Sequence, residues 1–230
     1  NKNIPGIYIE FKEPWLNPKG FEQIVYDVLA NTQDMNIIEK PEPEDTPFYI
    51  NNGTINVGNT NGKVILQTFS LESLVRVAEV FQGKVPMCFL LWKGTGATDL
   101  TYDDPLGYAS FINLGVKYKA HFIGPCIAGA PNDYPELDQP WQDYLIHRAK
   151  MKNHPYTFDT YDQMAKYFGQ YNFGVADGMF NPPYLDALFT NHSDMSINYM
   201  ITHGWRKSPA SQTLVDAREV LRKLGYLDNN

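Results

Sequence analysis

Short apolar runs of strand length alternate with amphipathic, helix-like segments along most of this chain. The runs that predict strands cover Ile7–Lys12, Val64–Phe69, Val85–Trp92, His121–Cys126, Lys152–Phe158 and Asp177–Phe180. Between most of them, apolar residues recur three and four positions apart, which is the spacing of a buried helical stripe. Strands that alternate with helices in this way predict a parallel sheet covered by helices.

The spacing predicts helices over Gly20–Leu29, from Leu71 onward, and over Tyr108–Val116, Trp141–Lys150, Tyr161–Phe168 and about 209–224. Ser70 precedes the second of these and is placed to cap it. Residues 31–63 interrupt the rhythm with prolines at 41, 43 and 47 and with Gly-Asn pairs, so they predict a long loop or a small hairpin insertion.

The first predicted strand changes character toward its end. Tyr8, Glu10 and Lys12 share one face, whereas the residues between them are apolar. A strand that turns polar at its C-terminal end is typical of the active-site rim of a (β/α)8 barrel. A carboxylate beside an ammonium group suits a hard cation and a phosphoryl oxygen together, although a purely structural Glu-Lys pair would show the same pattern.

Composition and charge narrow the possible functions. The chain has 230 residues, 43% of them hydrophobic, and a net charge of −7. The acidic balance argues against a nucleic-acid partner, and no apolar run approaches the length of a membrane span. Cys88 and Cys126 lie in apolar stretches and read as core residues. The chain carries neither a His-Glu-x-x-His zinc motif nor a Gly-x-Ser-x-Gly elbow.

Four segments, in order, resemble the glycerophosphodiester phosphodiesterase family, most closely its longer, exported bacterial branch. They are Gly6–Trp15 with a Glu-x-Lys strand followed by Pro-Trp, Val64–Ser70 with Thr68 replacing Ser in a Gln-Ser-Phe strand, His154–Phe158, and Asp177–Phe180. The family's His-Arg-Gly strand, Glu-x-Asp strand and later His-Asp pair have no counterpart and would lie before Asn1. Asn-Pro-Pro-Tyr at residues 181–184 also replaces the usual Thr-Asp-x-Pro.

The resemblance implies an α/β fold, a (β/α)8 TIM barrel of the phosphatidylinositol-phosphodiesterase-like type without its first two βα units. The barrel domain would cover residues 1–190, with the insertion at about 31–63 and a C-terminal extension over 191–230. The implied activity is metal-dependent hydrolysis of glycerophosphodiesters to glycerol 3-phosphate and an alcohol. Membership of the exported branch would place the protein in the periplasm or outside the cell.

The resemblance also assigns roles to residues. Glu10 would be a ligand of Ca²⁺ or Mg²⁺, and Lys12 would be a catalytic cation beside the phosphate. The side chains expected to contact a small phosphodiester substrate are Gln67, Phe69, Trp92, His154 and Tyr156. Taken one at a time, the residues leave alternatives open: Gln67 could bond within the barrel interior, Phe69 and Trp92 could be core residues, and His154 could be structural.

Two other functions remain open at this point. One is a phospholipase-D-like enzyme of the same fold, which would act on lipids and present an apolar patch near the rim. The other is a catalytically incomplete chain that binds a phosphorylated ligand through Lys12 without turning it over.

Overall fold

The computed structural model describes residues 6–13, 15–17, 19–31, 48–51, 54–57, 64–92, 104–170, 185–203, 222 and 225–226. The chain divides into two compact units, Asn1–His192 and Ser193–Asn230. The first unit contains the parallel sheet and the candidate site. The second contains α6 (Ser193–Thr202).

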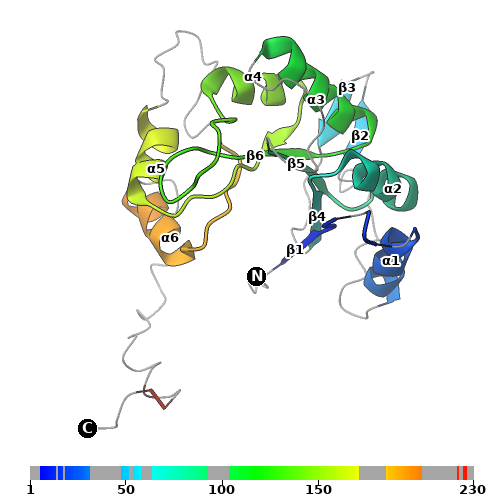
Figure 1. Ribbon diagram of the computed structural model, residues 1–230, viewed down its shortest axis with the longest axis horizontal. Helices are drawn as coiled ribbons and strands as arrows, with labels where there is room; N and C mark the ends of the chain where they lie inside the picture. The colour runs from blue at the N-terminus through cyan, green and yellow to red at the C-terminus, as the bar shows by residue number, and fades with distance from the viewer. Residues whose placement is uncertain are drawn as a thin grey trace. The chain divides into compact units, whose positions relative to one another are not determined.

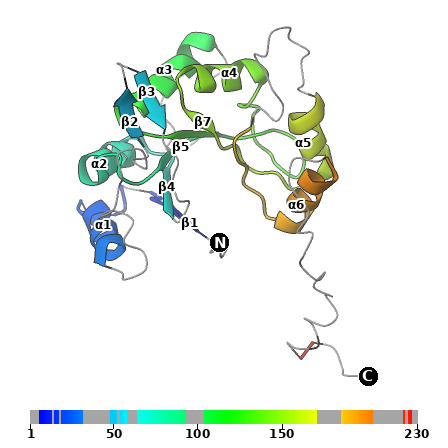
Figure 2. The ribbon, with the colours of Figure 1, turned by 180° about the vertical axis from the view of Figure 1, so that it is seen from behind.

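A five-stranded parallel sheet forms the centre of the first unit. Its strands follow chain order: β1 (Ile7–Glu10), β4 (Val64–Thr68), β5 (Met87–Leu91), β6 (Phe122–Pro125) and β7 (Lys152–Asn153). Figures 1 and 2 show the strands side by side in this sequence. The predicted parallel α/β arrangement is therefore confirmed for these five strands. The sixth predicted strand, Asp177–Phe180, lies outside the described residues.

Helices follow the parallel strands as the periodicity predicts. They are α1 (Phe21–Asn31), α2 (Leu71–Phe81), α3 (Pro105–Lys117), α4 (Pro140–Arg148) and α5 (Tyr161–Ala165), which continues as the π-helical turn η2 (Lys166–Gln170). The predicted insertion contains an antiparallel hairpin of β2 (Phe48–Asn51) and β3 (Thr54–Val57). None of the described helices combines the length and the apolar character needed to cross a membrane.

Local capping explains where two of the helices begin. The Ser70 hydroxyl accepts the Ser73 N–H at 3.5 Å, as predicted for the start of α2. Helix α3 begins at Pro105, earlier than predicted, because the Asp104 carboxylate accepts the N–H groups of Leu106 and Gly107, both at 2.9 Å. A proline in the first turn loses no hydrogen bond there, since that N–H has no partner within the helix.

The main core lies between the helices and one face of the sheet. Apolar side chains from α1 to α4 bury against alternate strand residues, among them Leu66, Phe89 and Ile123. Figures 1 and 2 show these helices along the same side of the strands. A doubly wound sheet carries helices on both faces, whereas a barrel carries them only outside. The one-sided cover is therefore compatible with a partial (β/α)8 barrel.

Helix α6 was not expected from the sequence, which predicts a helix only at about 209–224 in the C-terminal region. Of that predicted range, the structure describes Arg222 alone. The apolar residues of α6, such as Tyr199, occur among Ser, Asp and Asn, so the segment has only a weak stripe. Its helical character therefore could not be recognised from periodicity.

An extended segment covers the edge of β7 that a sixth strand would occupy. The Asp186 N–H donates to the Asn153 carbonyl at 3.0 Å, and the Phe189 N–H donates to the Pro155 carbonyl at 3.0 Å. The Phe158 N–H returns a bond to the Phe189 carbonyl at 2.8 Å. Residues 185–190 thus run alongside the β7 segment in the same direction and satisfy backbone groups that would otherwise form an open edge.

A partly buried polar network fixes the start of this edge segment. The Asp186 carboxylate accepts the Asn153 N–H at 2.8 Å and lies 2.8 Å from His147 Nε2. The other ring nitrogen of His147 is 3.2 Å from Asp143 Oδ2. The Asn153 side-chain amide donates to both Asp143, at 3.0 Å, and Asp138, at 2.8 Å. One imidazole therefore links α4 to the edge segment.

The charged groups of this network shift one another's pKa values. Burial opposes the charged form of His147, but Asp143 and Asp186 outweigh it and raise the His147 pKa to about 10. Burial also acts to raise the Asp186 pKa, but the hydrogen bonds from His147 and Asn153 hold it below its ordinary value. Burial raises the pKa of both Asp138 and Asp143.

We predict that His147→Gln weakens the pH dependence of stability on the alkaline side. An imidazole with a pKa of 6.5 unfolded and about 10 folded stabilises fully below pH 6.5. That contribution then falls as the pH rises to about 10. Urea unfolding across this range should therefore show a steeper loss of stability in wild type than in the variant.

The exposed His192 supplies the control, because His192→Gln removes an imidazole outside the network. Its unfolding free energy should follow the wild-type pH profile. The raised pKa values of Asp138 and Asp143 also make stability fall as the pH rises. The quantity to compare is therefore the difference in unfolding free energy between variant and wild type at each pH. Parallel profiles for wild type and His147→Gln would contradict the prediction.

Candidate functional site

The sheet face opposite the helices carries a second, smaller packed layer. Cys88, Leu90 and Phe122 form its centre, and partly buried side chains surround them, namely Tyr8, Ile65, Phe69 and Tyr156. Gly124 allows this packing, because a Cβ there would lie 2.7 Å from Leu90 Cδ2 and 2.9 Å from Cys88 Sγ. The layer is therefore closely packed and lies beneath the strand ends.

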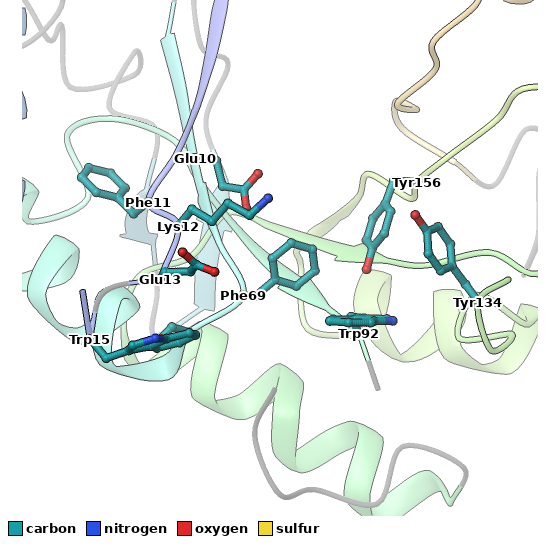
Figure 3. Close-up of a pocket in the computed structure, with 10 residues that line it drawn as sticks. Glu10, Phe11, Lys12, Glu13, Trp15, Phe69, Trp92, Tyr134 and Tyr156 are labelled. Atoms are coloured by element: carbon teal, nitrogen blue, oxygen red, sulfur yellow. The ribbon is translucent and has the colours of Figure 1, made fainter. Parts of the chain in front are cut away.

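Two adjoining pockets lie at the C-terminal ends of the strands, the edge at which parallel α/β proteins place their sites. The first, which we call the aromatic pocket, has a volume of about 360 Å³ and is lined by Glu10, Phe11, Lys12, Glu13, Trp15, Phe69, Ser70, Trp92, Tyr134 and Tyr156. Figure 3 shows these side chains. The second, the polar pocket, has a volume of about 250 Å³ and is lined by Glu10, Gln67, Phe69, Leu90, Tyr156, Thr157, Phe189, Thr190 and Asn191. Glu10, Phe69 and Tyr156 line both.

Hydrogen bonds between β1 and β4 determine the position of Glu10. The Phe11 N–H donates to the Gln67 carbonyl at 2.8 Å, and the buried Thr68 hydroxyl donates to the Phe11 carbonyl at 2.9 Å. The same hydroxyl accepts the Ser70 N–H at 3.1 Å. These bonds hold the ends of the two strands together, with Glu10 directly opposite Gln67 in the register.

Glu10 and Gln67 each present a buried oxygen that lacks a partner. Neither Glu10 Oε1 nor Gln67 Oε1 has a hydrogen-bond partner in the part of the chain that the structure describes. Leaving such an acceptor unsatisfied costs about 1–3 kcal/mol, so native proteins rarely retain one without a reason. Carboxylate and amide oxygens are ligands that Ca²⁺ and Mg²⁺ accept, and the pair therefore fits part of a hard-cation site.

These two oxygens do not complete a metal site by themselves. Within the described ranges, no group of three or more His, Cys, Asp or Glu side chains is arranged to hold a metal ion. Lys12 is exposed, and its side chain extends alongside Glu10 over the aromatic pocket (Figure 3). The site thus offers a cation and an unsatisfied anion at the same strand end.

Tilted aromatic rings form much of the wall of the aromatic pocket. The Phe69 ring centroid lies 6.3 Å from that of Trp92, with planes inclined by 71°, and 5.8 Å from that of Tyr156, with planes inclined by 85°. Tyr134 lies 5.9 Å from Tyr156. The Tyr156 hydroxyl donates to the Leu91 carbonyl at 3.0 Å, and burial raises its pKa above the ordinary value. Tyr156 therefore offers a fixed ring face, while its proton is retained.

His154 lies in the packed layer and lines neither pocket. Its Nδ1 is 3.1 Å from the Tyr8 hydroxyl, and its ring stacks on Phe122 at 4.0 Å. Burial lowers the His154 pKa to about 4, so the ring is neutral at pH 7. The structure thus places His154 in a position suited to packing, apart from the other predicted site residues.

Six of the seven residues predicted from the sequence line the two pockets: Glu10, Lys12, Gln67, Phe69, Trp92 and Tyr156. Their chemical roles remain predictions. The sequence pattern did not predict a site role for Glu13, Trp15, Tyr134, Thr157 or residues 189–191. Tyr134 lies in the loop after β6. Because the loops that follow parallel strands meet at one edge of the sheet, its position could have predicted a place in the site. Residues 189–191 carried no comparable signal, since the sixth strand was expected elsewhere.

The comparisons with known proteins add a structural likeness. No protein-family model matches this sequence, and no curated protein does. This chain is similar in structure to a protein from Silicibacter pomeroyi DSS-3 named "putative glycerophosphoryl diester phosphodiesterase", whose crystal structure it matches with a TM-score of 0.43 and 10% sequence identity. The match covers 63% of this chain and 40% of that chain, so this chain corresponds to less than half the length of that protein.

We predict that Gln67→Met leaves stability unchanged or raises it by up to about 1 kcal/mol, because it removes an unsatisfied buried acceptor while keeping the side-chain length. Gln163→Met is the matched control. Gln163 accepts the N–H groups of Asp159 and Thr160 and donates to the Gly129 carbonyl at 2.9 Å. Its loss should cost about 2–3 kcal/mol in urea unfolding. Equal destabilisation by the two changes would show that Gln67 is a structural residue.

Proposed function

We propose that this protein is a metal-dependent phosphodiesterase that cleaves glycerophosphodiesters to glycerol 3-phosphate and an alcohol. The observation that carries the proposal is that Glu10 and Gln67 each have a buried oxygen without a hydrogen-bond partner among the described residues, with Lys12 alongside Glu10 (Figure 3). The resemblance of the Glu-x-Lys and Gln-Thr-Phe strands supplies the substrate class. The proposal includes a (β/α)8 barrel of the phosphatidylinositol-phosphodiesterase-like type and, from the exported branch, a location in the periplasm or outside the cell.

Glu10 and Gln67 would hold the cation, either Ca²⁺ or Mg²⁺. Ca²⁺ takes about 6–8 oxygen ligands, so water, substrate and residues outside the described part of the chain would supply the others. When bound, such a cation neutralises charge that develops on phosphoryl oxygens. Open pockets lie on both sides of Glu10, so water and substrate could exchange in the remaining coordination positions of the cation.

Lys12 would provide the second positive charge. Its ammonium group can donate to a non-bridging phosphate oxygen, an interaction that strengthens as negative charge accumulates in the transition state. His154 is unsuited as the acid or base, since its ring is packed against Phe122 and lines neither pocket, and burial lowers its pKa, which makes it a weak base. The resemblance assigns those roles to histidines of strands that would precede Asn1.

Substitution at Glu10 tests the proposal through two independent measurements. Wild type should gain thermal stability on adding Ca²⁺ or Mg²⁺, because a ligand that binds the folded state alone stabilises it. Glu10→Gln should lose this gain and, in a protein that also carries the histidine-bearing strands, should lower metal-dependent hydrolysis of a glycerophosphodiester by at least about 100-fold. Lys12→Ala should keep the metal-induced gain but lower kcat/KM of that protein by about 100-fold, since it removes transition-state stabilisation.

Glu79→Gln is the control, because Glu79 is an exposed carboxylate on α2 that lies outside both pockets. It should behave as wild type in both assays. Hydrolysis that persists in the presence of a strong chelator would contradict the proposed metal dependence. An unchanged metal response in Glu10→Gln would show that the cation binds elsewhere.

A phospholipase-D-like activity is a second candidate, favoured by apolar exposure next to β1. Trp15 and Leu16 are 56% and 70% exposed, and they follow the strand that carries Glu10 and Lys12. Large apolar side chains exposed together can mark a lipid-contacting surface. Such a surface would let the same site act on a diester presented in a bilayer.

Leu16→Ser separates the two candidates, because Leu16 is exposed and lines neither pocket. If lipids are the substrate, the variant should bind phosphatidylcholine vesicles several-fold more weakly and lose activity on them, with unchanged activity on a soluble diester. Leu106→Ser, at an 80% exposed position of α3, is the control. Wild type that neither binds nor cleaves the vesicles would exclude this second candidate.

A further inference from the structure

We propose that the aromatic pocket binds an alcohol headgroup that carries a quaternary ammonium group, as choline does, and that the polar pocket binds the glycerol half of the substrate. The inference deepens the proposed function and rests on it for the position of the phosphate. The arrangement of two unlike pockets about a shared Glu10 carries it.

The first step is the aromatic wall. Phe69, Trp92, Tyr134 and Tyr156 form a connected set of rings, whose neighbouring planes are inclined by 64–85°. The rings therefore enclose the pocket from different directions and do not form a single stack (Figure 3). Trp15 adds a further ring on the β1 side. Aromatic cages of this kind bind quaternary ammonium groups through the negative faces of their rings.

The second step is the charge. Glu10, Lys12 and Glu13 are the charged residues of this pocket. With Glu10 assigned to the metal ion and Lys12 to the phosphate, Glu13 is the carboxylate that remains for the headgroup. In Figure 3, Lys12 extends toward Glu10, whereas the Glu13 carboxylate lies between Trp15 and Phe69. Glu13 is therefore placed to attract a cation held among the rings. An uncharged or anionic headgroup would gain nothing from this carboxylate.

The third step is the contrast with the polar pocket. Gln67, Thr157, Thr190 and Asn191 bring amide and hydroxyl groups to it, which can donate to and accept from the hydroxyls of glycerol. The Asn191 backbone and side-chain N–H groups both donate to Asp159, each at 2.8 Å, so this part of the lining is held in place.

Together these steps orient the substrate. A phosphate near Glu10 and Lys12 would lie where the two pockets meet, with one ester arm entering each. The volume of the aromatic pocket, about 360 Å³, lies at the small end of ligand pockets and suits a compact headgroup. A glycerophosphodiester of choline type thus matches both halves of the site.

Direct binding tests this proposal without catalysis. The protein is titrated with choline and with 3,3-dimethyl-1-butanol, which has the same shape but no charge, and tryptophan fluorescence or calorimetry records binding. Choline should bind at least about threefold more tightly, the lower range of a cation–π contribution. Glu13→Gln, a conservative change at an exposed residue, should weaken choline binding and leave the neutral alcohol unaffected.

Trp92→Leu should weaken choline binding by about three- to thirty-fold. Trp141→Leu is its control, since Trp141 of α4 packs against Tyr108 of α3 at 5.5 Å and lines neither pocket. Circular dichroism of each variant confirms the fold. Equal binding of choline and the neutral alcohol, or binding of neither, would overturn the proposal.

Hydrolysis then separates this inference from the function on which it rests. Choline binding with kcat/KM that is higher for glycerophosphocholine than for an uncharged analogue would support both. Metal-dependent hydrolysis without headgroup preference and without choline binding would overturn the headgroup assignment and leave the phosphodiesterase intact. Choline binding with no hydrolysis of any diester would keep the cation pocket and reject the enzyme.

Discussion

The register between β1 and β4 is the constraint on which the candidate site depends. Side chains alternate between the two faces of a strand, so a slip of one residue would turn Glu10 into the helix-covered core and turn Phe11 out of it. The Thr68 hydroxyl opposes such a slip, because it joins the Phe11 carbonyl to the Ser70 N–H inside the protein. One buried hydroxyl thus holds the strand that carries Glu10 and Lys12 and the start of α2 in a fixed relation.

A second constraint acts from the opposite side of the site. The ion pair of His147 and Asp186 holds residues 185–190 against the β7 segment, and Phe189 then packs edge-on against Tyr8 of β1 at 4.8 Å. The polar pocket takes its lining from both sides, since Glu10 and Gln67 come from β1 and β4 while Thr190 and Asn191 follow the edge segment. The site therefore depends on contacts between segments that are distant in sequence. Local propensity alone could not have specified it.

The sequence predicted those parts of the fold that a local pattern determines. Alternation placed Glu10 and Gln67 on one face, and the fully apolar β5 reads as a strand buried on both faces, as it is. His154 shows the limit of such reasoning: a strand over Lys152–Phe158 was predicted to contain it, but β7 ends at Asn153, and the stacking of His154 on Phe122 depends on a neighbouring strand. Likewise, the segment beside β7 follows from the network around Asp186, a tertiary arrangement without a periodic signature.

The central claim is that a divalent cation binds between the oxygens of Glu10 and Gln67, and anomalous diffraction tests it most directly. Crystals of the protein soaked in Mn²⁺, which accepts the same oxygen ligands as Mg²⁺, would locate the ion independently of any activity. The account predicts an anomalous peak within coordination distance of a Glu10 carboxylate oxygen, at the junction of the two pockets. Manganese bound only at other positions, with Glu10 and Gln67 contacting protein donors instead, would contradict it.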